Sequence, residues 1–322
     1  MRTSTDLDAR AHRLLGDGPW AVATVTSDGT DLAARGIPLD GRVEIGSISK
    51  GVTGLLYADA IARGEVDPGD RLSVHLPLGG SPAGDVTLAA LATHRSGLPP
   101  LPDKVVTRRT VKWLAAAQNP YGDTLCELLD QTRSTRLRRE KSRYSNLGFQ
   151  LLGHAVAAAA GTTYRRLVQE RIAAPLGLTS LTVPHSTAEL GPDDVDGLTR
   201  FGRVSQAWTG EGLGPAGGIR MSIADAGRLA GALLDGSAPG VDAIDPVAEL
   251  MGPAIRIGAG WITSQHQGST VTWHNGQTGG FRSWLGVDLA GAAATVVVRG
   301  RVTSTDRPAF RLLSDISALR WT

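Results

Sequence analysis

The sequence predicts an α/β protein in which both ends of the chain contribute strands to one sheet and the middle forms a mainly helical domain. Strand patterns occur between residues 20 and 47 and return between residues 257 and 298. Between these regions, and after the last strand, apolar residues recur with helical spacing. Such helices can cover the apolar faces of a sheet. We place the sheet domain at residues 1–75 and 210–322, and the helical domain at residues 76–209.

The first part of the chain predicts a helix, a hairpin, a further strand and a second helix. Residues 6–15 have the pattern of a short amphipathic helix. The apolar run at residues 20–26 is followed by an Asp-Gly turn, which is typical of a β-hairpin. A strand then leads through residues 43–47. Beyond it, apolar residues at helical spacing predict a helix over residues 47–64.

The rest of the chain is punctuated by glycine and proline, which mark the ends of the predicted elements. The predicted helices cover residues 87–94, 147–160, 164–174 and 308–319, with a further helix starting at Ser222. The predicted strands cover residues 257–263, 271–274, 283–287 and 294–298.

The composition indicates a globular enzyme and excludes several other classes of protein. Hydrophobic residues make up 41% of the chain and charged residues 20%. The net charge of +2 gives no argument for nucleic acid, and no apolar segment is long enough to span a membrane. The single cysteine, Cys126, excludes an internal disulfide, and its apolar helical surroundings predict a buried position. Residues 1–10 lack the apolar core of a secretory signal, so we expect a cytoplasmic protein.

Ser47 and Lys50 form the first candidate catalytic pair. The change from strand to helix at Gly46 puts Ser47 at a helix start, and residues three apart share one helix face. The lysine amine can therefore reach the serine hydroxyl, and unpaired helix N–H groups can stabilise an anion there. Lys50 is one of four lysines and alone has a serine three positions earlier. The alternative is that Ser47 is simply the N-cap of the helix.

Two further motifs contain residue types suited to catalysis. Tyr144 and Asn146 directly precede the predicted helix at residue 147, where Asn146 could act only as an N-cap. An ammonium such as Lys50 can lower the pKa of a nearby phenol, which would let Tyr144 act as a base. His274 ends a strand and is followed by a glycine-rich stretch that permits close approach of a ligand. A histidine at a strand end can instead be structural.

Together these motifs resemble those of the serine β-lactamase and penicillin-binding-protein superfamily. Ser47-Ile48-Ser49-Lys50 matches its Ser-x-x-Lys motif. Tyr144-Ser145-Asn146 and His274-Asn275-Gly276 look like the Tyr-x-Asn and His-x-Gly motifs of the class C branch. That branch includes esterases, D-amino-acid peptidases, amidases and acyltransferases as well as β-lactamases. Similar segments also occur at residues 91–99, 119–122 and 216–222, and the resemblance runs from about residue 20 through nearly the whole chain.

The resemblance implies a serine β-lactamase-like fold, with an antiparallel sheet flanked by helices and an active site between the two domains. It implies acyl transfer through an ester on Ser47, with Lys50 and Tyr144 relaying the proton. The backbone N–H groups of Ser47 and Gln277 would form the oxyanion hole. The residues implied in substrate binding are Asn146, His274, Gly276 and Thr278. The resemblance implies no cofactor.

The reaction catalysed is open between several alternatives. The first is a serine hydrolase acting on an ester or amide, such as an esterase, amidase or D-aminopeptidase. The second is an acyltransferase of secondary metabolism, and the third is a catalytically silent binding module, which the intact Ser47, Lys50 and Tyr144 disfavour. A β-lactamase or DD-peptidase is less expected because their substrates lie outside the cytoplasm. Gln277 replaces a residue that is usually small, so we expect poor β-lactam turnover.

The expected partner is a small ester or amide, with no nucleic acid and no membrane. The substrate could be acidic or carried by a protein, because a basic run precedes Tyr144 and clustered charge steers partners. The run comprises Arg133, Arg136, Arg138, Arg139, Lys141 and Arg143. No metal is expected, since the seven histidines form no H-E-x-x-H or similar cluster.

Overall fold

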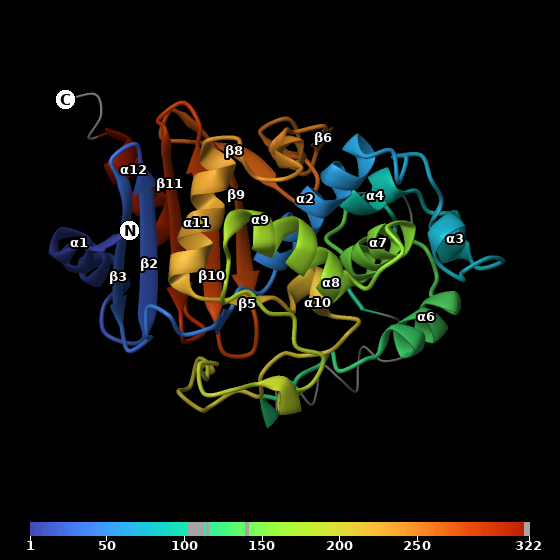
Figure 1. The fold of residues 1–322 in the computed structure, drawn as a ribbon, viewed down its shortest axis with the longest axis horizontal. Helices are drawn as coiled ribbons and strands as arrows, with labels where there is room; N and C mark the ends of the chain where they lie inside the picture. The colour runs from blue at the N-terminus through green and yellow to red at the C-terminus, as the bar shows by residue number, and fades with distance from the viewer. Residues whose placement is uncertain (102–112, 114–115, 139–141, 319–322) are drawn as a thin grey trace.

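The computed structural model describes residues 1–101, 113, 116–138 and 142–318 of the chain. Nine strands of this part form one sheet in the order β1-β3-β2-β11-β10-β9-β8-β7-β6 (Figure 1). Its neighbours pair antiparallel, except that β1 runs parallel to β3. The N-terminal strands are β1 (Arg2–Thr3), β2 (Trp20–Thr26) and β3 (Gly29–Arg35). The C-terminal strands are β6 (Ala248–Glu249), β7 (Ile255–Ile257), β8 (Ile262–His266), β9 (Ser269–Gln277), β10 (Arg282–Asp288) and β11 (Ala293–Arg299).

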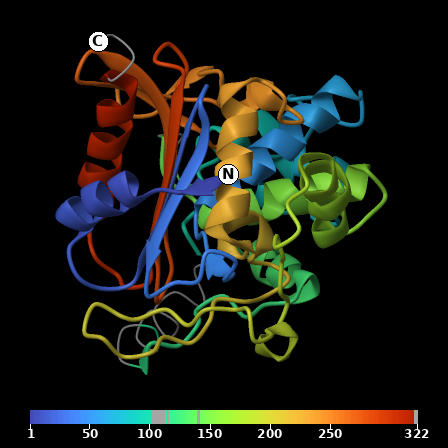
Figure 2. The ribbon, with the colours of Figure 1, turned by 60° about the vertical axis from the view of Figure 1, so that its left-hand side comes forward.

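Helices cover both faces of this sheet, which explains why β2 is apolar at nearly every position. Trp20 and Val22 enter one core cluster, and Ala21 and Ala23 enter another on the opposite face. The first cluster lies under α1 (Thr5–Leu15) and α12 (Asp306–Ala318). The second lies under α11 (Ile223–Leu234), with the other helices beyond it (Figure 2).

The remaining helices lie on the α11 side of the sheet, to its right in Figure 1. Within this group, α2 packs against both α7 and α10. A short second sheet pairs β4 (Val43–Glu44) with β5 (Arg220–Met221). The helices are α2 (Ile48–Ala62), α3 (Leu72–His75), α4 (Leu88–Ala92), α6 (Leu125–Arg133), α7 (Asn146–Ala159), α8 (Tyr164–Val168), α9 (Ala174–Leu176) and α10 (Gly214–Gly217).

The predicted α/β class and the sheet shared by both chain ends are confirmed, whereas three local predictions are wrong. The strand predicted over residues 257–263 is two strands, because the chain turns between Ile257 and Ile262 and pairs with itself. The strand expected through residues 43–47 ends at Glu44. Cys126 is exposed, because the buried face of α6 is formed by Leu128, Leu129 and Thr132 instead.

Candidate active site

Ser47 lies directly before the first residue of α2, at the floor of a cleft. Its hydroxyl caps no helix N–H group, so the interpretation of Ser47 as a simple N-cap does not hold. The Oγ atom instead accepts hydrogen bonds from Lys50 Nζ at 2.9 Å and from Tyr144 Oη at 2.6 Å. The structure therefore brings together the serine, lysine and tyrosine of two sequence motifs that lie almost a hundred residues apart.

Lys50 is fully buried on the first turn of α2. Its Nζ atom also donates to the Ala216 carbonyl of α10 at 2.6 Å. One turn further along α2, the Thr53 hydroxyl donates to the neighbouring Pro215 carbonyl. These two bonds fix the helix, and thereby Ser47, against α10. Burial lowers the pKa of Lys50 well below its ordinary value, because a charged amine loses its hydration there. A neutral amine is a proton acceptor.

Tyr144 comes from the opposite side of the cleft, just before α7. Although 41% of its surface is exposed, its hydroxyl points inward and donates to Ser47. Burial of that end raises the pKa of Tyr144 above its ordinary value, and the hydrogen bond with Ser47 opposes the rise. The predicted lowering by an adjacent ammonium is therefore wrong in direction. The loss of hydration on burial is the larger effect on this phenol.

Two glycines let strand β9 approach Ser47 closely. A Cβ atom at Gly46, which has φ +52°, would lie 2.8 Å from the Gln277 nitrogen. A Cβ atom at Gly276 would lie 2.2 Å from the Ile45 carbonyl oxygen and 3.0 Å from the Ser47 nitrogen. Both contacts are too short for a side chain. The glycines thus bring the Ser47 and Gln277 backbone nitrogens, the two predicted oxyanion-hole donors, to the same small region.

The end of β9 has an edge that β8 does not cover. The ladder between β8 and β9 stops at Trp273, whereas the ladder between β9 and β10 continues to Gln277. Residues 275–277 consequently line the cleft. Gly276 is among them, as predicted for a residue that contacts substrate.

Asn146 lines the cleft, but it is not the cap of α7. Ser145 caps that helix by accepting a hydrogen bond from the Gly148 N–H. Asn146 is the first helical residue, and its amide donates to Tyr121 Oη at 2.6 Å. The amide is therefore held in place at the cleft wall.

His274 and Thr278 do not line the cleft. Burial, and then the proximity of Lys50, lowers the pKa of His274 to about 3, and its Nδ1 lies 2.5 Å from the Asn275 carbonyl oxygen. The Thr278 hydroxyl accepts from the Phe281 N–H at 3.2 Å and belongs to the turn between β9 and β10. Neither placement matches the substrate contact that we predict from the sequence. His274 is buried, and the centre of its ring lies 6.4 Å from that of Tyr144.

The cleft has a volume of about 360 Å³ and an aromatic wall opposite β9. The indole of Trp208 packs against Tyr121, with ring centres 5.0 Å apart, and against Trp113 at 6.1 Å. Arg282 lines the β9 side, and its buried Nε has no hydrogen-bond partner among the described residues. The cleft therefore offers apolar surface on one side and an unpaired positive charge on the other.

Comparison with known proteins identifies the family. The model of the Beta-lactamase family matches residues 13–316. The chain belongs to the Beta-lactamase family. The predicted relationship to serine β-lactamases and penicillin-binding proteins is therefore confirmed.

Individual relatives of the family are distant. The chain is 30% identical over 190 residues to the D-alanyl-D-alanine-carboxypeptidase/endopeptidase AmpH of Escherichia coli K12, which covers 53% of this chain and 47% of that protein. A Beta-lactamase from Pseudomonas fluorescens is 28% identical over 185 residues, or 56% of this chain and 48% of that one. The chain thus spans about half the length of the curated relatives it matches.

Solved structures of the family share the whole fold. A class C β-lactamase from Rhodobacter sphaeroides superposes with a TM-score of 0.79 at 21% identity, over 99% of this chain and 100% of that one. The D-alanine carboxypeptidase AmpC from Burkholderia cenocepacia gives 0.80 at 21% identity, over 96% and 99%. The predicted serine β-lactamase-like fold is confirmed.

Sequence reasoning missed the residues that shape the cleft of this family member. Tyr121 lies in the segment 119–122, whose likeness to the family was a usable signal, but Trp208 stands in a loop without any motif. Arg282 follows the glycine-rich turn, where an isolated charge at a strand start was the only indication.

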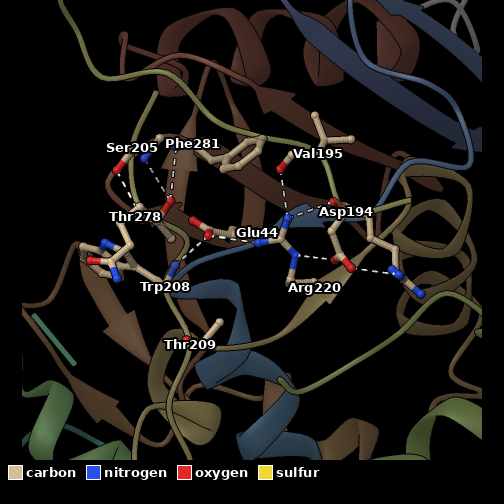
Figure 3. A network of polar contacts seen from close by, with 12 residues as sticks. Glu44, Asp194, Val195, Ser205, Trp208, Thr209, Arg220, Thr278 and Phe281 are labelled. Carbon is tan, nitrogen blue, oxygen red and sulfur yellow. Dashed lines mark hydrogen bonds and ion pairs between the residues drawn. The ribbon is translucent and has the colours of Figure 1, made fainter. Parts of the chain in front are cut away.

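A buried network of ion pairs supports the cleft from behind (Figure 3). Arg220 lies between Glu44 and Asp194, at 3.0 and 2.7 Å, and all three side chains are buried. Glu44 also accepts from the Trp208 N–H at 2.7 Å and from the Thr278 hydroxyl. One carboxylate thus ties the aromatic wall, the end of β9 and the strand before Ser47 to each other.

Neither metal ligation nor a membrane span is evident in the described part of the chain. Its histidine, cysteine and carboxylate side chains form no group of three that could hold a metal ion. None of its helices combines the length and the apolar character needed to cross a bilayer.

Proposed function

We propose that the protein is a serine hydrolase that cleaves an ester or amide through an acyl ester on Ser47. The observation that carries the proposal is the geometry of Ser47 Oγ, which lies within hydrogen-bond distance of both Lys50 Nζ and Tyr144 Oη. The chain's membership of a family that includes β-lactamases and carboxypeptidases supports it.

The first half-reaction forms the acyl-enzyme. Ser47 Oγ attacks the carbonyl carbon and its proton passes to the neutral amine of Lys50. The oxyanion is held by the N–H groups of Ser47 and Gln277, and such donors contribute about 2.7–4 kcal/mol each in other enzymes. When the bond to the leaving group breaks, the Tyr144 hydroxyl gives its proton to that group. The Lys50 ammonium then reprotonates Tyr144.

The second half-reaction runs the same relay in reverse order. Water attacks the acyl carbon and loses a proton to the relay formed by Lys50 and Tyr144, and the bond to Ser47 Oγ breaks as the serine regains its proton. The pKa directions suit these roles, because burial favours the neutral amine of Lys50 and the protonated phenol of Tyr144. The relay thus begins without a net charge.

The lining of the cleft favours a substrate with an apolar or aromatic group and an anionic group. The apolar group would pack on Tyr121 and Trp208, where burial contributes about 25 cal/mol per Å². The anionic group would pair with Arg282. The basic run before Tyr144 is a weaker source of such charge. Among its described members none lines the cleft, and Arg139 and Lys141 lie outside the described residues.

Acyl transfer to an acceptor other than water is the second candidate. Gln277 lines the cleft beside Ser47, where its amide can bind an acceptor or hinder water. Increasing concentrations of amine or alcohol acceptors should then divert the acyl group from hydrolysis. Strict hydrolysis across a broad acceptor panel would remove the support for a transferase.

Intact-protein mass spectrometry tests the hydrolase proposal. The protein is treated with a fluorophosphonate, an activated aryl ester, a D-alanyl-D-alanine peptide and penicillin, alongside Ser47→Ala. We expect one fluorophosphonate adduct on Ser47, absent from the variant, rapid ester turnover, and either no penicillin adduct or a long-lived one. An adduct that persists in Ser47→Ala rejects the assignment. Fast nitrocefin turnover would instead assign the protein to the β-lactamases.

A further inference from the structure

His94 is a buried histidine with an uncommon backbone conformation, next to the predicted catalytic tyrosine. It follows α4 and is 2% exposed. Its φ of +56° is in the left-handed region, which is unfavourable for residues other than glycine. Such strain persists only where surrounding contacts hold it, and it is concentrated at functional sites. The contacts of His94 therefore show what the conformation achieves.

His94 contacts three consecutive residues of the segment that carries Tyr144. Its carbonyl oxygen accepts a hydrogen bond from the Arg143 N–H at 2.8 Å. Its ring packs against the ring of Tyr144, with centres 4.6 Å apart. Its Nδ1 accepts a hydrogen bond from the Ser145 N–H at 3.2 Å. One residue thus fixes the backbone on both sides of Tyr144 and one face of its ring.

The histidine is itself held from behind. The centre of its ring lies 4.8 Å from that of Phe149, which is fully buried in α7. Because Nδ1 accepts a hydrogen bond, the neutral ring carries its proton on Nε2. This buried Nε2 has no partner among the described residues. Leaving a buried donor unpaired costs about 1–3 kcal/mol, so the arrangement is not optimised for stability.

His94 is also kept neutral. Burial lowers its pKa well below the ordinary value, and the proximity of Lys50 and then His274 lowers it further. No proton is therefore available from His94 for the reaction near neutral pH, and the residue is absent from the lining of the cleft. Its contribution must act through Tyr144.

We propose that His94 is a positioning residue for Tyr144, which holds the phenol hydroxyl at hydrogen-bond distance from Ser47 Oγ. The proposal rests on the hydrolase function proposed above. It differs from a purely structural role, which would change the amount of folded protein but not the reaction of the folded fraction. Misplacement of a reacting group by about 1 Å can cost about 10²-fold in rate.

The test compares His94→Asn with His154→Asn. Asparagine tolerates the left-handed backbone but has no ring to pack on Tyr144. His154, in α7, is a matched control because it is also buried and does not line the cleft. Its Nε2 bonds the Glu211 carbonyl, and its ring packs against Tyr164. We expect His94→Asn to lower kcat for an aryl ester about 10–100-fold with KM changed less than about threefold. His154→Asn should leave the kcat of the folded fraction unchanged.

Combination with Tyr144→Phe gives a readout that a structural role would not move. A residue that acts through the Tyr144 hydroxyl has little left to lose once that hydroxyl is removed. His94→Asn should therefore lower kcat less than about twofold in the Tyr144→Phe background. A full 10–100-fold loss of kcat in the Tyr144→Phe background would overturn the proposal. The proposal would also be overturned if the loss of activity in His94→Asn alone were no larger than its loss of folded protein.

Fluorophosphonate labelling separates failure of this inference from failure of the proposed function. If the wild-type protein is not labelled at Ser47, the proposed function fails first. If the wild-type protein is labelled and His94→Asn is labelled at the same rate, only the role of His94 is rejected. If His94→Asn does not fold, His94→Gln replaces it, because its longer amide also lacks the aromatic ring. The same kinetic criteria then apply.

Discussion

Two buried polar regions, one around Glu44 and one around Lys50, lie on either side of the start of α2 and differ in how their charged groups are paired. In the first, around Glu44, every charged side chain has a partner, as Arg220 bonds both Glu44 and Asp194. In the second, around Lys50, the basic side chains of Lys50, His94 and His274 are buried together. Among the described residues, the Lys50 amine hydrogen-bonds only a hydroxyl and a carbonyl. We name these regions the paired network and the unpaired cluster.

The two regions show that one fold can use buried ionisable groups in two ways. Groups with ion-pair partners can stabilise the structure, and groups without them are suited to proton transfer. In the paired network, burial raises the pKa of Asp194, but hydrogen bonds from Gly191 and Arg42 and the charge of Arg220 lower it overall. Burial raises the pKa of Glu44, and the charge of Arg220 opposes that rise without cancelling it. In the unpaired cluster, burial lowers the pKa values of Lys50, His94 and His274 without a carboxylate to oppose it. Pairing opposes the effect of burial on charge and fixes geometry, whereas its absence favours a neutral amine beside Ser47, the proposed nucleophile.

The largest expected effect comes from removing the reactive groups of the unpaired cluster. Lys50→Met and Tyr144→Phe should each lower kcat/KM by about 10²–10⁴-fold, the range for loss of a general acid or base. The double variant should lose little more, because members of one relay are not additive. Steady-state kinetics on an aryl ester would measure this. Losses that multiply independently would show that Lys50 and Tyr144 do not share a relay.

A change to the paired network should act on stability. Arg220→Met leaves Glu44 and Asp194 buried without their shared partner, which should cost about 3–5 kcal/mol in the free energy of unfolding. Urea denaturation would measure the loss. The control is Arg220→Met combined with Glu44→Gln, which removes one uncompensated charge. This double variant should recover part of the lost free energy of unfolding. If Arg220→Met retained wild-type stability, the contrast between the two regions would disappear.

Lys50→Met should have the opposite effect on stability. Because the pKa of Lys50 is lowered in the folded protein, the unfolded chain binds more protons and wild-type stability rises with pH. The variant lacks this dependence. Its advantage over the wild-type protein should therefore shrink as the pH rises towards the ordinary lysine pKa of about 10.4. Denaturation at several pH values tests the sign. An advantage that grows with pH would mean that Lys50 is charged in the folded state.

The smallest expected effect concerns His274. Its pKa of about 3 in the folded protein lies below the ordinary value of about 6.5, so protonation of the unfolded chain weakens the wild-type protein as the pH falls between these values. His274→Gln removes this contribution. Relative to the variant, the wild-type protein should lose about 1 kcal/mol between pH 6.5 and 5.5. Parallel stability curves for the two proteins over this range would contradict the assignment.

The comparison also explains what the sequence could and could not predict. The fold class followed from apolar periodicity, and the meeting of Ser47 and Lys50 followed from helical spacing within one segment. Contacts between residues far apart in the sequence could not be predicted from such local patterns. The pKa direction of Tyr144 depends on the burial of its own hydroxyl in the folded protein. The position of the cleft wall depends on contacts such as that of Glu44 with the Trp208 N–H. Motifs named the reactive residues, but only tertiary packing determines their charge states.

The pairing of β2 with β11 inside the sheet has a consequence for the order in which the protein is synthesised and folds. Trp20 pairs with Arg299 and Val25 with Ala294, so the middle of the sheet joins the two ends of the chain. During synthesis Ser47 and Lys50 emerge early, whereas β9, which lines the same cleft, is made more than 200 residues later. Contacts of such long sequence separation form slowly. We therefore expect Ser47 to be unreactive in the nascent chain and to gain reactivity only when β9, β10 and β11 have joined the sheet.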